Sequence, residues 1–114
     1  MRVSIIGQGY VGLTIAVGAA GAGHTVVGFD INESLVVQLN AGKSHIEGIT
    51  DADLSSFIAA GLYEASAEPS ILDGSDVIVI AVPTPLDDQR NPDLSYVHNA
   101  AGLIQNNVKS PTLI

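Results

Sequence analysis

A glycine-rich turn between two short apolar segments constrains the fold of this chain most strongly. Residues 2–6 read as an apolar strand, and Gly7, Gly9 and Gly12 then form the pattern G-x-G-x-x-G. A helical pattern follows, and a second apolar strand ends in the acid Asp30. This order of strand, glycine turn, helix, strand and acid predicts a dinucleotide-binding βαβ unit.

Each residue of the pattern has its own physical reason. Gly7 lets the chain turn sharply as it leaves the strand, Gly9 lets a pyrophosphate approach the backbone, and Gly12 lets the helix pack closely. The N–H groups and the positive dipole end of the helix attract phosphates. The carboxylate of Asp30 can accept both hydroxyls of an adenine ribose. The alternative is a glycine-rich turn that binds no ligand.

Strand and helix patterns alternate along the whole chain, which predicts an α/β fold with a doubly wound parallel sheet. Residues 76–82 form a continuous apolar run, typical of a parallel strand buried on both faces. With no internal repeat or linker, residues 1–114 form one dinucleotide-binding domain. We expect a fragment truncated after about the fifth or sixth strand, without central and substrate domains. The further elements that we expect are strands at 63–67 and 112–114, helices at 10–22, 32–41, 51–60 and 93–106, and a helical turn at 69–72.

Composition excludes several classes of function. Four basic residues face twelve acids, giving a net charge of −8, so we expect neither nucleic acid nor an anionic membrane surface as a partner. An anionic cofactor must therefore be held by backbone amides. The chain has no cysteine, and its three histidines lack metal-ligand spacing, so we expect no metal site. Without a signal peptide or spanning segment, we expect a cytoplasmic protein.

Four motifs resemble the nucleotide-sugar 6-dehydrogenases, the UDP-glucose/GDP-mannose dehydrogenase family. They are Gly-Tyr-Val-Gly at 9–12, Phe-Asp-Ile-Asn at 29–32, Ala-Val-Pro-Thr-Pro at 81–85 and Pro-Asp-Leu-Ser-Tyr-Val at 92–97. The resemblance covers essentially all of the chain as the family's N-terminal, Rossmann-type NAD-binding domain. The branch acting on UDP-N-acetylmannosamine or UDP-N-acetylglucosamine is nearest, because residues 45–49 lack the Glu-Pro-Gly-Leu element usual in the glucose branch.

The resemblance implies that the cofactor is NAD and assigns residues to it. Tyr10 and Val11 would contact the pyrophosphate through their backbones, Asp30 would bind the adenosine ribose, and Thr84 would lie beside the nicotinamide side. The predicted cofactor-binding set is Gly7, Gly9, Tyr10, Val11, Gly12, Asp30 and Thr84. One departure concerns Leu35, which stands where the family often has a basic residue.

The resemblance also implies a reaction for the intact protein. The family oxidises the C6 alcohol of a nucleotide sugar to a carboxylate with two NAD, here a UDP-N-acetylhexosamine or UDP-glucose, and we expect a homo-oligomer. Its catalytic cysteine, lysine and asparagine cannot be matched to this chain, so we predict no catalytic residue and no activity for the 114 residues alone. Two alternatives remain: a stand-alone NAD(H)-sensing regulatory module, and another NAD-dependent reductase of the same fold.

Overall fold

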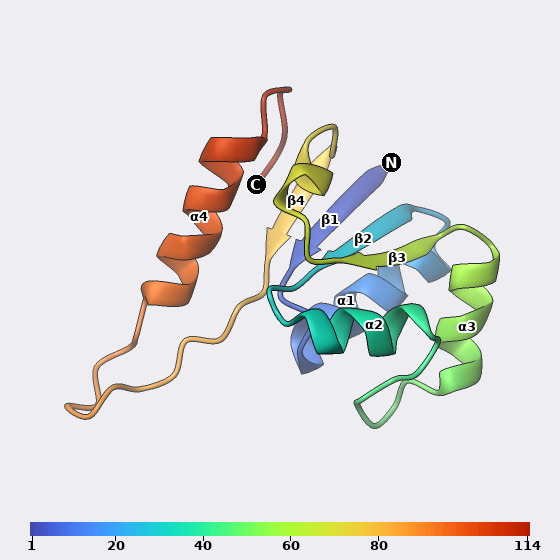
Figure 1. Ribbon diagram of the computed structural model, residues 1–114, viewed down its shortest axis with the longest axis horizontal. Coiled ribbons are helices and arrows are strands. Elements are labelled where there is room, and N and C mark those ends of the chain that lie inside the picture. The colour runs from blue at the N-terminus through green and yellow to red at the C-terminus, as the bar shows by residue number, and fades with distance from the viewer.

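The computed structural model describes residues 1–114 and contains a four-stranded, fully parallel sheet in the order β3-β2-β1-β4 (Figure 1). The strands are β1 (Arg2–Ile6), β2 (Thr25–Phe29), β3 (Tyr63–Ser66) and β4 (Val77–Ile80). The helical elements are α1 (Tyr10–Gly21), α2 (Glu33–Asn40), α3 (Asp51–Ala59), the 3₁₀ turn η1 (Pro69–Leu72) and α4 (Ser95–Asn107). The predicted doubly wound α/β fold is confirmed.

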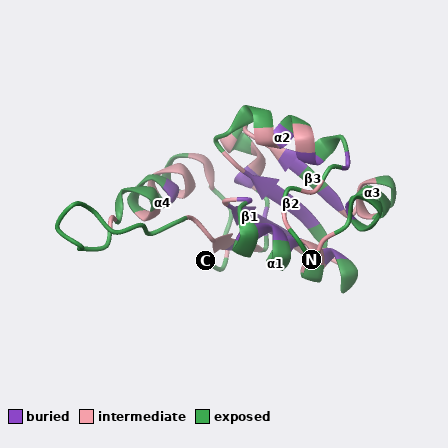
Figure 2. Ribbon diagram, turned by 90° about the horizontal axis from the view of Figure 1, so that it is seen from below, coloured by how far each residue is buried: buried purple, intermediate pink, exposed green.

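Helices cover both faces of the sheet. On one face, Ile5 of β1 packs in a core with Leu13 of α1 and residues of α2 and α3. On the other face, Ile6 packs with Leu72 of η1 and Ala100 of α4. Figure 2 shows that the buried residues concentrate in the strands, while the helices expose their outer sides. No helix combines the length and apolar character needed to cross a bilayer.

The strand order places a switch in connectivity beside β1. β2 and β3 extend the sheet on one side of β1, and β4 then pairs with its other side. Ligands of open α/β sheets bind at such a point, beyond the carboxyl ends of the strands. The turns that follow β1 and β4 lie very close here, because a Cβ built on Gly7 would stand 2.6 Å from the carbonyl oxygen of Ala81.

Several predicted elements differ from the observed ones by one or two residues at their ends, and two differences concern the last part of the chain. The helix expected from Asp93 begins at Ser95, because the Asp93 carboxylate accepts the Ser95 N–H at 2.9 Å. Hydrogen bonds from the Ser95 side chain and backbone also lower the pKa of Asp93. Residues 112–114 form a single parallel bridge, between Val77 and Leu113, instead of a strand. The sheet therefore has four strands where the sequence predicted five or six.

Two glycines of α1 occupy opposite environments. A Cβ on Gly12 would overlap the carbonyl oxygen of Gly7, so only glycine allows α1 to begin this close to the turn after β1. Gly18, in contrast, is exposed, and a Cβ there would meet no atom within 4 Å. The glycines inside this helix, Gly18 and Gly21, suggest from the sequence that α1 packs closely against the sheet at both positions. That interpretation is wrong for Gly18.

This contrast predicts opposite effects of one substitution. Gly18→Ala should raise the free energy of unfolding by about 0.5–1 kcal/mol, because alanine is the better helix former and nothing obstructs its methyl group. Gly12→Ala should lower it by about 1–3 kcal/mol, because the methyl group displaces the turn. Urea unfolding followed by circular dichroism measures both changes. A destabilised Gly18→Ala variant would contradict the open environment of that position.

Candidate functional site

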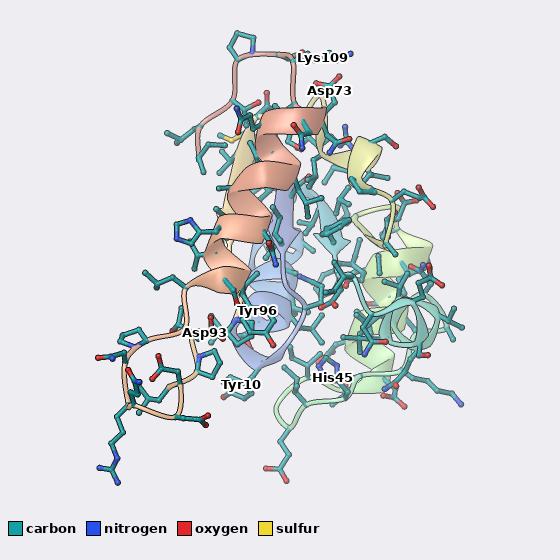
Figure 3. The ribbon with its side chains drawn as sticks, turned by 60° about the vertical axis from the view of Figure 1, so that its left-hand side comes forward. Tyr10, His45, Asp73, Asp93, Tyr96 and Lys109 are labelled. Atoms are coloured by element: carbon teal, nitrogen blue, oxygen red, sulfur yellow. The ribbon has the colours of Figure 1, made fainter.

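A cavity of about 750 Å³ lies at the carboxyl ends of the strands, between the beginning of α1 and α4. Its lining includes Ile6 at the end of β1, Asp30 directly after β2, and Ile80 at the end of β4. Tyr10 and Tyr96 line it from the first residues of α1 and α4, and Figure 3 shows both on the same side of the molecule. The volume is within the range of small-molecule and cofactor sites.

The structure brings five of the seven predicted site residues together in this cavity. The five are Gly7, Gly9, Tyr10, Val11 and Asp30. Gly12 is buried behind the turn and supports it rather than lining the cavity. Thr84 is exposed and is not part of the lining, although its neighbour Pro83 is.

The beginning of α1 offers free backbone donors to the cavity. Gly9 precedes the helix, its φ and ψ are −73° and −159°, and no side chain caps the helix. The N–H groups of Tyr10, Val11 and Gly12 donate to no acceptor in the chain, since the first intrahelical bond runs from Leu13 N to Gly9 O. A Cβ on Gly9 would meet no atom within 4 Å. The arrangement can therefore receive an anion at the positive end of the helix dipole.

Asp30 is held by backbone hydrogen bonds on both carboxylate oxygens. Oδ2 accepts the Gln8 N–H at 2.9 Å, and Oδ1 accepts the Asn32 N–H at 3.0 Å. The first bond ties the acid to the glycine turn, and the second ties it to the residue that caps α2. A carboxylate has about four acceptor positions, so each oxygen can still accept a hydroxyl from a ligand.

Asp30 is the only charged residue in the lining. No lysine, arginine or histidine lines the cavity. Leu35 lines it at the position where the family that this sequence resembles often has a basic residue. His45 is exposed and does not contribute to the lining. No group of three or more metal-ligating side chains lies close enough together to hold a metal ion.

Two parts of the site were not found from the sequence. One is the wall that α4 supplies through Asn99 and Leu103, which only the three-dimensional placement of that helix reveals. The other is a buried hydrogen bond behind the glycine turn, between Gln8 and Tyr63. Gly28 carried a signal for this bond, because a glycine inside an apolar strand often marks a close approach by another group.

Comparisons with known proteins agree with this geometry. Residues 1–114 match the model of the UDP-glucose/GDP-mannose dehydrogenase family, NAD-binding domain. UDP-N-acetyl-D-mannosamine dehydrogenase of Pyrococcus horikoshii is 38% identical over 101 residues, covering 88% of this chain and 24% of the relative. UDP-glucose 6-dehydrogenase of Haloferax volcanii is 39% identical over 101 residues, covering 89% of this chain and 24% of the relative.

Solved structures give the same result. The structure of the UDP-D-ManNAc dehydrogenase of Pyrococcus horikoshii has a TM-score of 0.92 and 34% identity to this chain. The match covers 99% of this chain and 27% of that one, so the chain spans about a quarter of the length of its relatives. The chain belongs to the UDP-glucose/GDP-mannose dehydrogenase family and corresponds to its NAD-binding domain.

Proposed function

We propose that this chain binds NAD in the cavity at the carboxyl ends of the strands, as the cofactor domain of a nucleotide-sugar dehydrogenase. One observation carries this proposal. The unpaired N–H groups of two lining residues at the beginning of α1, Tyr10 and Val11, share the cavity with a carboxylate that is already fixed in place. Backbone donors suit a pyrophosphate and a carboxylate suits a ribose, so the residues fit the adenosine diphosphate part of NAD.

Individual residues take distinct roles in this proposal. The N–H groups of Tyr10 and Val11 bind the pyrophosphate, and the missing side chain of Gly9 leaves space for it. Asp30 accepts the hydroxyls of the adenosine ribose. Gly7 and Gly12 shape the turn without needing to touch the cofactor. We assign the nicotinamide side to Thr84 on the family resemblance, and its neighbour Pro83 lines the cavity.

Charge makes NAD the expected form of the cofactor rather than NADP. A 2′-phosphate would lie beside the negative carboxylate of Asp30. Neither Ile31, Asn32 nor Leu35, which line the same part of the cavity, offers a positive charge to compensate. The site therefore favours a free 2′-hydroxyl.

The chemistry is that of an alcohol oxidation in a longer enzyme. Bound NAD supplies the hydride acceptor, and this domain binds and orients it. The chain has no cysteine, and the groups that act on the sugar belong to other parts of the enzyme, as the greater length of the relatives suggests. We expect the C6 alcohol to be taken to a carboxylate with two NAD. The dehydrogenase relatives favour this function over a stand-alone NAD sensor.

The substrate that we propose is a UDP-N-acetylhexosamine. The relative and the solved structure from Pyrococcus horikoshii are both named for UDP-N-acetylmannosamine. The Haloferax volcanii relative is named for UDP-glucose at 39% identity, so UDP-glucose is the second candidate. The absence of Glu-Pro-Gly-Leu from residues 45–49 favours the N-acetylhexosamine.

Asp30→Ala should weaken NAD binding by about 1–3 kcal/mol, because charge-assisted hydrogen bonds to the ribose are lost. Isothermal calorimetry with NADH and NADPH on the wild-type chain and the variant measures this. Asp88→Ala is the matched control, since Asp88 is exposed on the loop after β4 and lies outside the cavity lining. Tighter binding of NADPH than of NADH to the wild-type chain would refute the assignment.

Substitution of Gly9 should remove cofactor binding and leave the fold intact. A Cβ at this position would meet no protein atom within 4 Å, and the added side chain would enter the space that we propose for the pyrophosphate. We expect Gly9→Ala to weaken NAD binding about tenfold or more and Gly9→Val to abolish it, with unfolding free energies within about 1 kcal/mol of wild type. Unchanged NAD affinity in Gly9→Val would place the cofactor elsewhere.

The substrate proposal is tested by kinetics. In the full-length enzyme, kcat/KM should be higher for UDP-N-acetylmannosamine or UDP-N-acetylglucosamine than for UDP-glucose, by about tenfold or more. The 114-residue chain alone should form no NADH with any of the three. A higher kcat/KM for UDP-glucose would make UDP-glucose the preferred substrate and refute our choice. NADH formation by the 114-residue chain would contradict the prediction that it lacks the catalytic groups.

A further inference from the structure

A buried hydrogen-bonded pair lies directly behind the glycine turn. Gln8, between the first two glycines of the pattern, is 0% exposed, and Tyr63 of β3 is 3% exposed. The Tyr63 hydroxyl donates to Oε1 of Gln8 at 2.7 Å. We propose that Gln8 and Tyr63 are positioning residues that hold the turn in its cofactor-binding conformation before the cofactor arrives. This inference rests on the proposed NAD site.

Gln8 connects three parts of the site through one residue. Its Nε2 donates to the carbonyl oxygen of Gly7 at 3.0 Å and to that of Ile5 at 3.4 Å. Its backbone N–H donates to Oδ2 of Asp30 at 2.9 Å. The side chain thus fixes the turn against β1, and the backbone fixes the same turn against the acid proposed to bind the ribose.

The middle of β2 leaves room for this pair. A Cβ on Gly28 would overlap the amide of Gln8 and would stand 2.6 Å from the hydroxyl oxygen of Tyr63. Glycine weakens a strand, because it gives up side-chain packing and backbone entropy. At this position the loss makes space for the Gln8 amide, which otherwise could not reach Tyr63.

The Gly7 carbonyl and the Tyr63 hydroxyl together fix the orientation of the Gln8 amide. Burial, together with the negative charge of Asp30, raises the pKa of Tyr63, so the hydroxyl keeps its proton and acts as a donor. The Gly7 carbonyl can only accept, so the NH₂ group of Gln8 faces it and the amide oxygen faces Tyr63. The Tyr63 hydroxyl donates to that oxygen and so stabilises the orientation in which the donor of Gln8 points at the turn.

A purely structural pair elsewhere in the molecule provides a matched control. Ser4 and Ser75 are also buried, and their hydroxyls form one hydrogen bond at 2.6 Å. Neither residue lines the cavity or contacts the glycine turn through its side chain. Removing one hydroxyl from each pair breaks one buried hydrogen bond in each case. The comparison tests whether cofactor binding depends on the place of the lost bond behind the glycine turn or only on the lowered stability of the fold.

The experiment compares Tyr63→Phe with Ser75→Ala in the 114-residue chain, using NADH titration and urea unfolding. Tyr63→Phe should raise the Kd for NADH about tenfold, because the unsupported turn samples conformations that do not bind. Ser75→Ala should reduce stability and change the Kd less than about twofold. An unchanged Kd in Tyr63→Phe, or equal weakening in both variants, would overturn the inference. Failure of the wild-type chain to bind NADH would instead refute the proposed function.

A double variant covers the case in which Tyr63→Phe folds poorly. Gln8→Met combined with Tyr63→Phe keeps similar volumes and leaves no side-chain oxygen without a donor, so stability should recover relative to Tyr63→Phe alone. In the double variant the Gly7 carbonyl loses its donor, the amide of Gln8, so NADH should bind about tenfold more weakly than to wild type. Wild-type affinity in the double variant would show that the turn needs no support from Gln8.

Discussion

The close approach of α1 to the turn after β1 is the constraint on which the rest of the site depends. Gly12, in the first turn of α1, lies so near the Gly7 carbonyl that no side chain fits between them. This contact aims the first turn of α1 at the carboxyl ends of the strands, where the connectivity switches from one side of β1 to the other. The free N–H groups of this turn therefore face the cavity that Asp30 also lines.

The site attracts an anion without using a basic side chain. The chain carries a net charge of −8, and the only charge in the cavity lining is negative. Unpaired backbone N–H groups therefore supply the attraction. Such donors are fixed by the fold, so the cofactor need not order flexible lysine or arginine side chains when it binds.

The sequence predicted the parts of the structure that depend on local spacing. Gly7, Gly9, Gly12 and Asp30 follow from the chain geometry of one βαβ unit, and Asn32 caps α2 as its residue type indicates. The α4 wall and the Gln8–Tyr63 pair depend on which distant segments the sheet brings together. Residues 112–114 look like a strand by composition, but they form only one bridge to β4. Residue patterns do not encode such long-range contacts.

The two bonds to Asp30 have a consequence for engineering cofactor preference. One carboxylate oxygen already accepts the Gln8 N–H, so this acid holds the turn as well as facing the ligand. Exchanging it for an apolar or basic side chain, as a redesign toward a phosphorylated ribose could use, also leaves that N–H without an acceptor. Asp30 therefore serves both the selection of the cofactor and the preorganisation of the glycine turn. A successful redesign needs a replacement acceptor for Gln8 in addition to a new positive charge.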